Sequence, residues 1–108
     1  MLVTYKTLGQ SNPAATTATT LYTVPAATQA VCSTLVVCNQ GLAATFRVAV
    51  RVAGLALTEK QYLYYDVALP AGATLCTTIG ITLGAADVVT VYASTATVSF
   101  SLFGQEIS

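Results

Sequence analysis

The feature that most constrains this chain is a two-residue hydrophobic alternation within residues 44–69, ATFRVAVRVAGLALTEKQYLYYDVAL. Successive side chains of a β-strand point to opposite faces, so apolar residues at every second position predict a strand with one buried face. One predicted face carries Phe46, Val48, Val50 and Val52, and the other carries Thr45, Arg47, Ala49 and Arg51. The first part of the stretch is therefore expected to be a half-buried strand.

The alternation returns at residues 62–69, after a polar segment expected to form an exposed loop. One face of this second strand would hold Leu63, Tyr65, Val67 and Leu69, and the other would hold Tyr62, Tyr64, Asp66 and Ala68. The two strands are expected to be adjacent. One face of the pair would build a core, and the face bearing Arg, Tyr and Asp would be free to meet a partner.

Five further segments resemble strands, and no segment of helical length shows a 3.6-residue period. They are residues 21–24, 31–39, 74–83, 88–93 and 97–103. Turn signals separate them, and the short link at residues 94–96 is expected to close a hairpin. The pattern predicts an all-β fold: a single antiparallel β-sandwich of about seven strands, either immunoglobulin-like or jelly-roll-like.

Residues 1–20 are expected to form an extended N-terminal arm, and residues 21–108 the β-sandwich domain. The arm has apolar positions at Leu2, Val3 and Tyr5, followed by turn residues and the low-complexity run AATTATT. Two interpretations remain open. The arm is either a frayed terminus or a segment that embraces a neighbouring subunit.

Charge is scarce, at 7% of residues against roughly 25% in average soluble domains. Thr and Ala, with 18 residues each, would have to cover much of the surface. One interpretation is a secreted, Thr-rich β-domain. The other is that much of the surface is buried against other subunits, because charge is depleted in interface cores.

Several function classes find no support in the sequence. The formal net charge is zero and no basic patch is present, which argues against nucleic-acid binding. The chain has no His and no motif that pairs a nucleophile with a base, so no enzyme activity, metal or cofactor is expected. The N-terminus lacks the apolar run of a signal peptide, and no run is long enough for a membrane helix.

The three cysteines, Cys32, Cys38 and Cys76, are expected to be free thiols in a reducing cytoplasm. On one strand the first two would lie roughly 20 Å apart, too far for a disulfide. A bridge from one of them to Cys76 on a neighbouring strand stays open.

Candidate interface residues come from the arm and from the polar strand faces. They are Leu2, Val3, Tyr5, Arg47, Arg51, Tyr62, Tyr64 and Phe103. The arginines are either solvated, locally ion-paired, or in contact with a carboxylate of a partner. The tyrosines are either strand-surface aromatics or anchors at a protein interface, where Tyr is enriched.

Four runs carry a resemblance to a known group: LYTVPAATQAVCSTLVVCNQ, FRVAVRVAG, QYLYYDVALPAGATL and ITLGAADVVTVYASTATVSFSLFGQEI. In pattern and phrase, residues 21–107 are similar to short virion proteins of tailed bacteriophages. The resemblance implies a β-sandwich, a role in virion assembly and no enzyme activity.

The leading functional hypothesis is a capsid decoration (cement) protein, located in the virion and assembled in the host cytoplasm. Its expected partners are the major capsid protein and copies of itself, in a homo-oligomer such as a trimer. Nucleic acid and membrane are not expected as partners. The alternative is a tail, baseplate or fibre component that binds a host receptor or other tail proteins. A secreted adhesin is a third hypothesis, but it would need an export signal.

Overall fold

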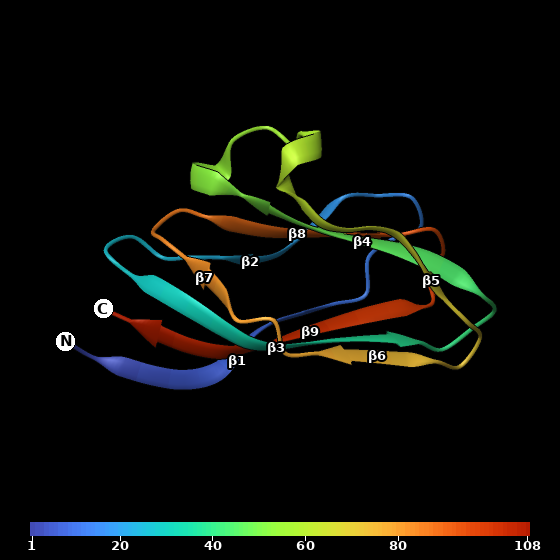
Figure 1. Ribbon diagram of the computed structural model, residues 1–108, viewed down its shortest axis with the longest axis horizontal. Coiled ribbons are helices and arrows are strands. Elements are labelled where there is room, and N and C mark those ends of the chain that lie inside the picture. The colour runs from blue at the N-terminus through green and yellow to red at the C-terminus, as the bar shows by residue number, and fades with distance from the viewer.

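The computed structural model describes residues 1–108. The chain forms two antiparallel sheets that pack face to face (Figure 1). Sheet A has the order β1 (Val3–Ser11), β9 (Val98–Ile107), β3 (Gln29–Asn39) and β6 (Thr74–Thr77), with β7 (Ile81–Leu83) also paired to β3. Sheet B has the order β2 (Thr19–Thr23), β8 (Val88–Ala93), β4 (Ala44–Arg51) and β5 (Tyr62–Leu69). The predicted all-β sandwich is confirmed, with nine strands in place of about seven.

The connectivity decides between the two predicted sandwich types. The chain crosses from one sheet to the other at almost every connection, and it stays within a sheet only from β4 to β5 and from β6 to β7. With β6 and β7 as one interrupted strand, this gives two four-stranded sheets wound as a jelly roll. The link at residues 94–96 is therefore not a hairpin, because β8 and β9 lie in different sheets.

The core lies between the sheets and is built from the inward side chains of both. The ring of Phe46 on β4 meets that of Phe100 on β9 edge-on, with centroids 6.1 Å apart. Leu35, Val48 and Leu102 are among the fully buried side chains around them. Phe46 and Val48 thus occupy the core as the alternation predicts. The only helical elements are the 3-10 turns η1 (Val52–Gly54) and η2 (Glu59–Gln61), and no helix could cross a membrane.

The predicted assignment of faces on β5 is wrong for its first half, because a β-bulge interrupts the strand at Asp66. The backbone there has φ of +49°, and the register with β4 shifts between Phe46 and Val48. A bulge inserts an extra residue and so reverses the side chains on one flank. Tyr64 therefore packs against the core, while Leu63 and Tyr65, predicted to be buried, are 46% and 57% exposed.

The single strand predicted for residues 74–83 is two short strands. Gly80 adopts a φ of +65°, which only glycine tolerates easily, and the backbone between β6 and β7 leaves the ladder. Both pieces pair with β3, at opposite ends of it. The alternation of apolar residues continues through both β6 and β7, so it did not predict the break between these strands.

The expected N-terminal arm is a strand of the sandwich itself. Residues 3–11 form β1, which pairs along its length with β9 at the edge of sheet A, and Leu8 enters the core. Leu2 and Ser108 also exchange both backbone hydrogen bonds. Neither a frayed terminus nor an arm lying on a neighbour describes this arrangement.

A polar latch holds β1 and β9 against sheet B. The buried Tyr22 of β2 donates its hydroxyl hydrogen bond to Glu106 Oε2 on β9 over 2.6 Å. The Nζ of Lys6 on β1 lies 3.3 Å from the other carboxylate oxygen. The donated Tyr22 hydrogen bond, aided by Lys6, outweighs burial and holds the pKa of Glu106 below its ordinary value of 4.5. Burial and the same carboxylate raise the pKa of Tyr22.

A second polar cluster ties together the opposite end of the sandwich. Buried Asn39, at the end of β3, donates through Nδ2 to the backbone oxygens of Leu42, Leu69 and Pro70 over 2.7, 3.1 and 3.2 Å. Its Oδ1 accepts from the backbone N–H of Gly41 and from the hydroxyl of Thr97, both over 3.0 Å. One side chain thus links three chain connections.

Removing residues 1–11 should lower the stability of the domain markedly. The deletion takes Leu8 out of the core, worth about 1.5–3 kcal/mol, and exposes the backbone edge of β9. Urea denaturation followed by circular dichroism would measure the loss. The control is Tyr5→Ala, which removes a side chain that is 79% exposed and should change stability by less than about 0.5 kcal/mol. An unchanged midpoint after the deletion would contradict the assignment of β1 to the fold.

Acid should weaken the fold through Glu106. A carboxyl whose pKa is lowered in the folded state contributes stability that is complete above its unfolded value and is lost as pH falls through the folded value. Stability should therefore drop as pH falls below about 4.5. Glu106→Gln should show a shallower drop, because Gln does not titrate. Glu59→Gln, at an exposed carboxylate without an ion pair, should keep the wild-type profile. Urea midpoints at pH 7 and pH 3 test this, and parallel profiles for the wild type and Glu106→Gln would contradict it.

Candidate interaction surfaces

The outer face of sheet A carries no charged side chain. Strand β3 shows why: Ala30, Cys32, Leu35 and Val37 are buried, so the residues that alternate with them point outward. The strand pairing then places the residues of β1, β9, β6 and β7 that lie beside them on the same outer face of the sheet. The outward set includes Val3, Tyr5, Thr7, Val31, Thr34, Val36, Cys38, Thr74, Cys76, Thr82, Ser99, Ser101, Phe103, Gln105 and Ile107. We call this surface the A face.

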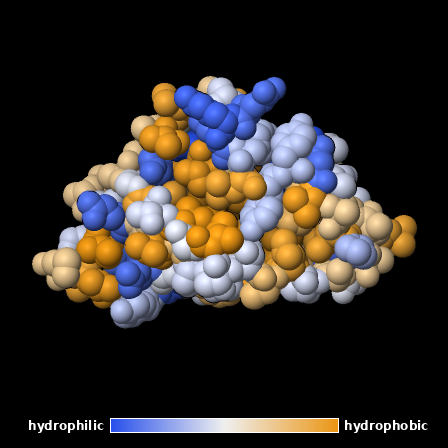
Figure 2. Space-filling view, in the orientation of Figure 1, coloured by the Kyte–Doolittle hydropathy of each residue, from blue (hydrophilic) through white to orange (hydrophobic).

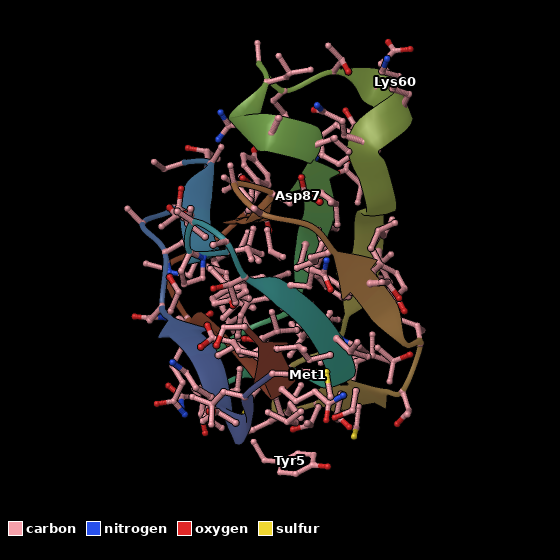
Figure 3. The ribbon with its side chains drawn as sticks, turned by 90° about the vertical axis from the view of Figure 1, so that its left-hand side faces the viewer. Met1, Tyr5, Lys60 and Asp87 are labelled. Atoms are coloured by element: carbon pink, nitrogen blue, oxygen red, sulfur yellow. The ribbon has the colours of Figure 1, made fainter.

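Three of the predicted interface residues lie on the A face. Val3 and Tyr5 project from β1, and half-buried Phe103 lies on β9, paired with Thr7 and Thr34. Leu2 precedes β1 and is also exposed. Figure 3 shows Tyr5 pointing away from the sandwich, at the side of the molecule opposite Lys60. The sequence grouped Leu2, Val3 and Tyr5 as an arm separate from the strand that ends at Phe103, whereas the structure brings Val3 and Tyr5 onto one face with Phe103 through strand pairing.

A shallow hollow of about 260 Å³ interrupts the A face beside Tyr5, between Val31, Ser33, Gly104 and Gln105. It lies where the register of β3 and β9 shifts between Cys32 and Thr34. The two backbones lie close together there, so that a Cβ on Gly104 would clash with the carbonyl oxygen of Val31. Glycine at this position allows the two strands to approach so closely.

The outer face of sheet B has a different chemistry, centred on Arg47 of β4. Its guanidinium carbon lies 4.2 Å from the ring centroid of Tyr65 and 4.2 Å from that of Tyr92. Nε and Nη2 donate to the two carboxylate oxygens of Asp66 over 2.6 and 3.2 Å. The Asp66 hydrogen bond raises the pKa of Arg47, and the reciprocal bond lowers the pKa of Asp66. Arg47 is thus locally ion-paired, one of the options left open by the sequence.

The loop of residues 52–61 folds over the rest of this face. Arg51 donates to the backbone oxygens of Leu55 and Gly54, and the backbone N–H of Ala53 donates to Asp87. A capping box between Thr58 and Gln61 fixes the second turn of the loop. Figure 2 shows hydrophilic side chains at the crest of the molecule and hydrophobic ones below it. The loop thereby positions its residues beside the aromatic side chains of β5.

A wider hollow of about 700 Å³ opens between this loop and β5. Leu57, Thr58 and Glu59 line it from the loop, and Tyr62 and Tyr65 line it from the strand. The two tyrosine rings meet edge-on, with centroids 4.9 Å apart. Because Tyr65 also stacks on Arg47, the wall of the hollow is continuous with the arginine stack. We call Leu57, Thr58, Glu59, Tyr62 and Tyr65 the aromatic hollow.

The sequence placed only part of this surface correctly. Arg47 and Tyr62 contribute to it, but Tyr64 is directed inward, with its hydroxyl bonded to Thr77, and Arg51 serves the loop. Tyr65 and Tyr92 were missed. The signal that could have found Tyr65 is Asp66, a poor strand former in the middle of a strand, where a bulge is the expected accommodation.

The acidic and cysteine side chains of the chain are scattered. No group of three or more His, Cys, Asp or Glu side chains could hold a metal ion. All three cysteines are free thiols, as expected. Cys32 faces the core, where burial raises its pKa to about 11. Cys38 and Cys76 lie on the A face, offset from each other in the register.

Comparison with known proteins supports the fold. No protein-family model matches the chain, and no curated protein matches it in sequence. The structure is similar to a chain in a structure of infectious bursal disease virus, Gx strain, with a TM-score of 0.55 and 15% sequence identity. The likeness covers 97% of this chain and 32% of that chain, so this chain spans about a third of its length. At this identity the likeness shows a shared fold.

Replacing Arg47 by Lys should loosen β5. Lysine cannot stack as a plane between two tyrosine rings or donate two parallel hydrogen bonds to Asp66. Amide protons of β5 should exchange faster with solvent, measured by hydrogen–deuterium exchange. Arg51→Lys is the matched control, since Arg51 lies on the same strand but bonds only to the loop. It should speed exchange in residues 52–55 and leave β5 unchanged, and equal effects of both variants on β5 would contradict a specific role for the stack.

Proposed function

We propose that this protein is a capsid decoration protein of a tailed bacteriophage, which binds the outside of the head and bridges neighbouring major capsid proteins. The observation that carries the proposal is the uncharged A face. A small soluble domain normally covers its surface with charge of both signs. Here all eight charged residues lie elsewhere, on sheet B, in the loops and in the latch.

The A face is large enough to be a binding surface. The molecule measures 44 × 27 × 20 Å, and with the two sheets stacked as in Figure 1 the face spans the longest and shortest of these extents. A standard interface takes roughly 800 Å² from each partner. A rigid sheet covered with Val, Thr, Ser and Tyr loses little conformational entropy when it is covered. We assign this face to the capsid shell.

Two further observations support a place in the virion. The sequence resembles short virion proteins of tailed phages over residues 21–107, and the fold resembles a chain in a virus structure. In this proposal the protein also associates with copies of itself around a symmetry axis of the shell. Each contact is then modest, but many repeated contacts bind the shell together through multivalency. The protein needs no cofactor and catalyses no reaction in this role.

A charge introduced at the centre of the A face should prevent attachment to the shell. Val36 and Ser101 are register partners there, so Val36→Lys and Ser101→Lys should each reduce co-sedimentation with undecorated capsids at least tenfold, because each lysine must be desolvated on binding. Leu42→Lys is the control, at an exposed position between β3 and β4. Circular dichroism would verify that each variant is folded.

Two outcomes would contradict this assignment. If both variants still attach, the shell is bound by another surface. If they instead lose self-association in sedimentation velocity while monomers attach normally, the A face is an interface between copies.

A tail, baseplate or fibre component is the second candidate. The aromatic hollow favours it, because exposed tyrosines beside a polar loop suit recognition of a host receptor. Copy number separates the two candidates. Quantitative mass spectrometry of purified virions should find hundreds of copies of a decoration protein, whereas a few to dozens would indicate a tail component.

A further inference from the structure

The outer surface of sheet B already binds one guanidinium group, that of the chain's own Arg47. Three side chains hold this group: the ring faces of Tyr65 and Tyr92 pack against it, and the carboxylate of Asp66 accepts its hydrogen bonds. Aromatic faces attract cations through their quadrupole, and a carboxylate accepts hydrogen bonds in the plane of the guanidinium. The arrangement shows which groups this surface uses to hold an arginine side chain.

The aromatic hollow beside it offers the same kinds of group without a cation. Tyr62 and Tyr65 supply aromatic walls, Glu59 supplies a carboxylate, and Leu57 supplies an apolar side chain. Glu59 is exposed and forms no ion pair within the chain.

The cations of the chain are mostly engaged elsewhere. Lys6 pairs with Glu106, Arg47 with Asp66, and Arg51 with backbone oxygens of the loop. Lys60 follows Glu59 directly and forms no ion pair with it. Tyr65 already stacks on Arg47, but the Glu59 carboxylate has no ion pair and no cation of the chain stacks on Tyr62.

We propose that the aromatic hollow receives an arginine side chain from a protein partner. The guanidinium would pack against Tyr62 and donate to Glu59, while its aliphatic stem lies along Leu57. Arginine fits better than lysine, because a planar guanidinium is weakly hydrated and can stack and donate at the same time. A neutral group would leave the Glu59 carboxylate partly desolvated without compensation.

A protein is the expected source of the arginine because further apolar side chains are exposed on the same loop. Val52 and Leu55, on the same loop as Leu57 and Glu59, are 59% and 62% exposed. A ligand that extends beyond one side chain could cover these apolar residues together with the hollow and exclude water from the central contact. This inference goes beyond the proposed attachment through the A face and does not depend on the identity of the virion partner.

Peptide titrations of the full chain test the proposal. The probes are acetyl-Leu-Arg-Leu-amide and its citrulline counterpart, which keeps the shape of arginine but has no charge. Binding is followed through the ring proton signals of Tyr62 and Tyr65 in NMR spectra at low salt. The arginine peptide should bind saturably and at least fivefold more tightly than the citrulline peptide. Glu59→Gln should abolish this preference, and Tyr62→Leu should weaken binding of the arginine peptide.

Lys60→Gln is the matched control, next to Glu59 and of opposite charge. It should leave binding unchanged or strengthen it, since a competing cation is removed. Unchanged signals of core residues would show that each variant is folded.

Four results would overturn the inference. These are equal binding of both peptides, retention of the preference in Glu59→Gln, binding of acetylarginine amide as tightly as the peptide, and saturable binding of a methyl glycoside that Glu59→Gln does not affect. The third result would indicate a small-molecule site, and the fourth a carbohydrate site.

Discussion

The fold depends on how its crossing connections are held, and the amide of Asn39 is the interaction that holds three of them. Buried backbone carbonyls need hydrogen-bond partners, and three of them lie near Asn39 where the chain leaves β3 and β5. Asn39 serves the carbonyls of Leu42, Leu69 and Pro70, and its own oxygen is satisfied by Gly41 and Thr97. A fully satisfied buried amide fixes one arrangement, because any shift leaves polar groups unpaired in a medium of low dielectric. The crossings that define the jelly roll are thereby locked at one end of the sandwich.

The free edges of the two sheets are guarded by their irregularity, although the sequence has few charges or prolines to protect them. Strand β1 has a bulge after Thr7 and turns Lys6 inward, β2 shifts register before Tyr22, and β5 is bent at Asp66. The remaining edge is divided into β6 and β7 by Gly80. Bulges, short strands and inward charges all discourage pairing with another sheet. Association of this protein is therefore expected to use its faces more than its edges.

Period-two alternation predicted the sandwich and the limits of β5 and β8 because apolar patterning is a local property of each strand. It could not predict bulges, since a bulge depends on the partner strand as well as on the strand that carries it. That is why Tyr64 and Tyr65 were assigned to the wrong faces. The arm was misjudged for a related reason: its alternating apolar residues Val3 and Tyr5 are exposed and β1 buries only Leu8, so its place in the fold depends on backbone pairing with β9. Within the candidate surfaces, the sequence indicated Arg47. It could not predict that Tyr92 of β8 lies beside Arg47, because that proximity depends on the order of strands in the sheet.

The two outer surfaces differ in chemistry, and their separation matters for the proposed binding role. The A face is uncharged, whereas the surface of sheet B carries Arg47, Asp66 and an aromatic hollow on the opposite side of the sandwich. Occupying one surface leaves the other exposed to solvent, as the opposed positions of Tyr5 and Lys60 in Figure 3 illustrate. Binding through the uncharged A face would depend mainly on the surface area that is buried and would vary little with salt concentration. Binding through charged groups on sheet B would be directional and would weaken as the salt concentration rises. In the proposed role, a shell covered through the A face would present the aromatic hollow outward, at a density set by the symmetry of the shell.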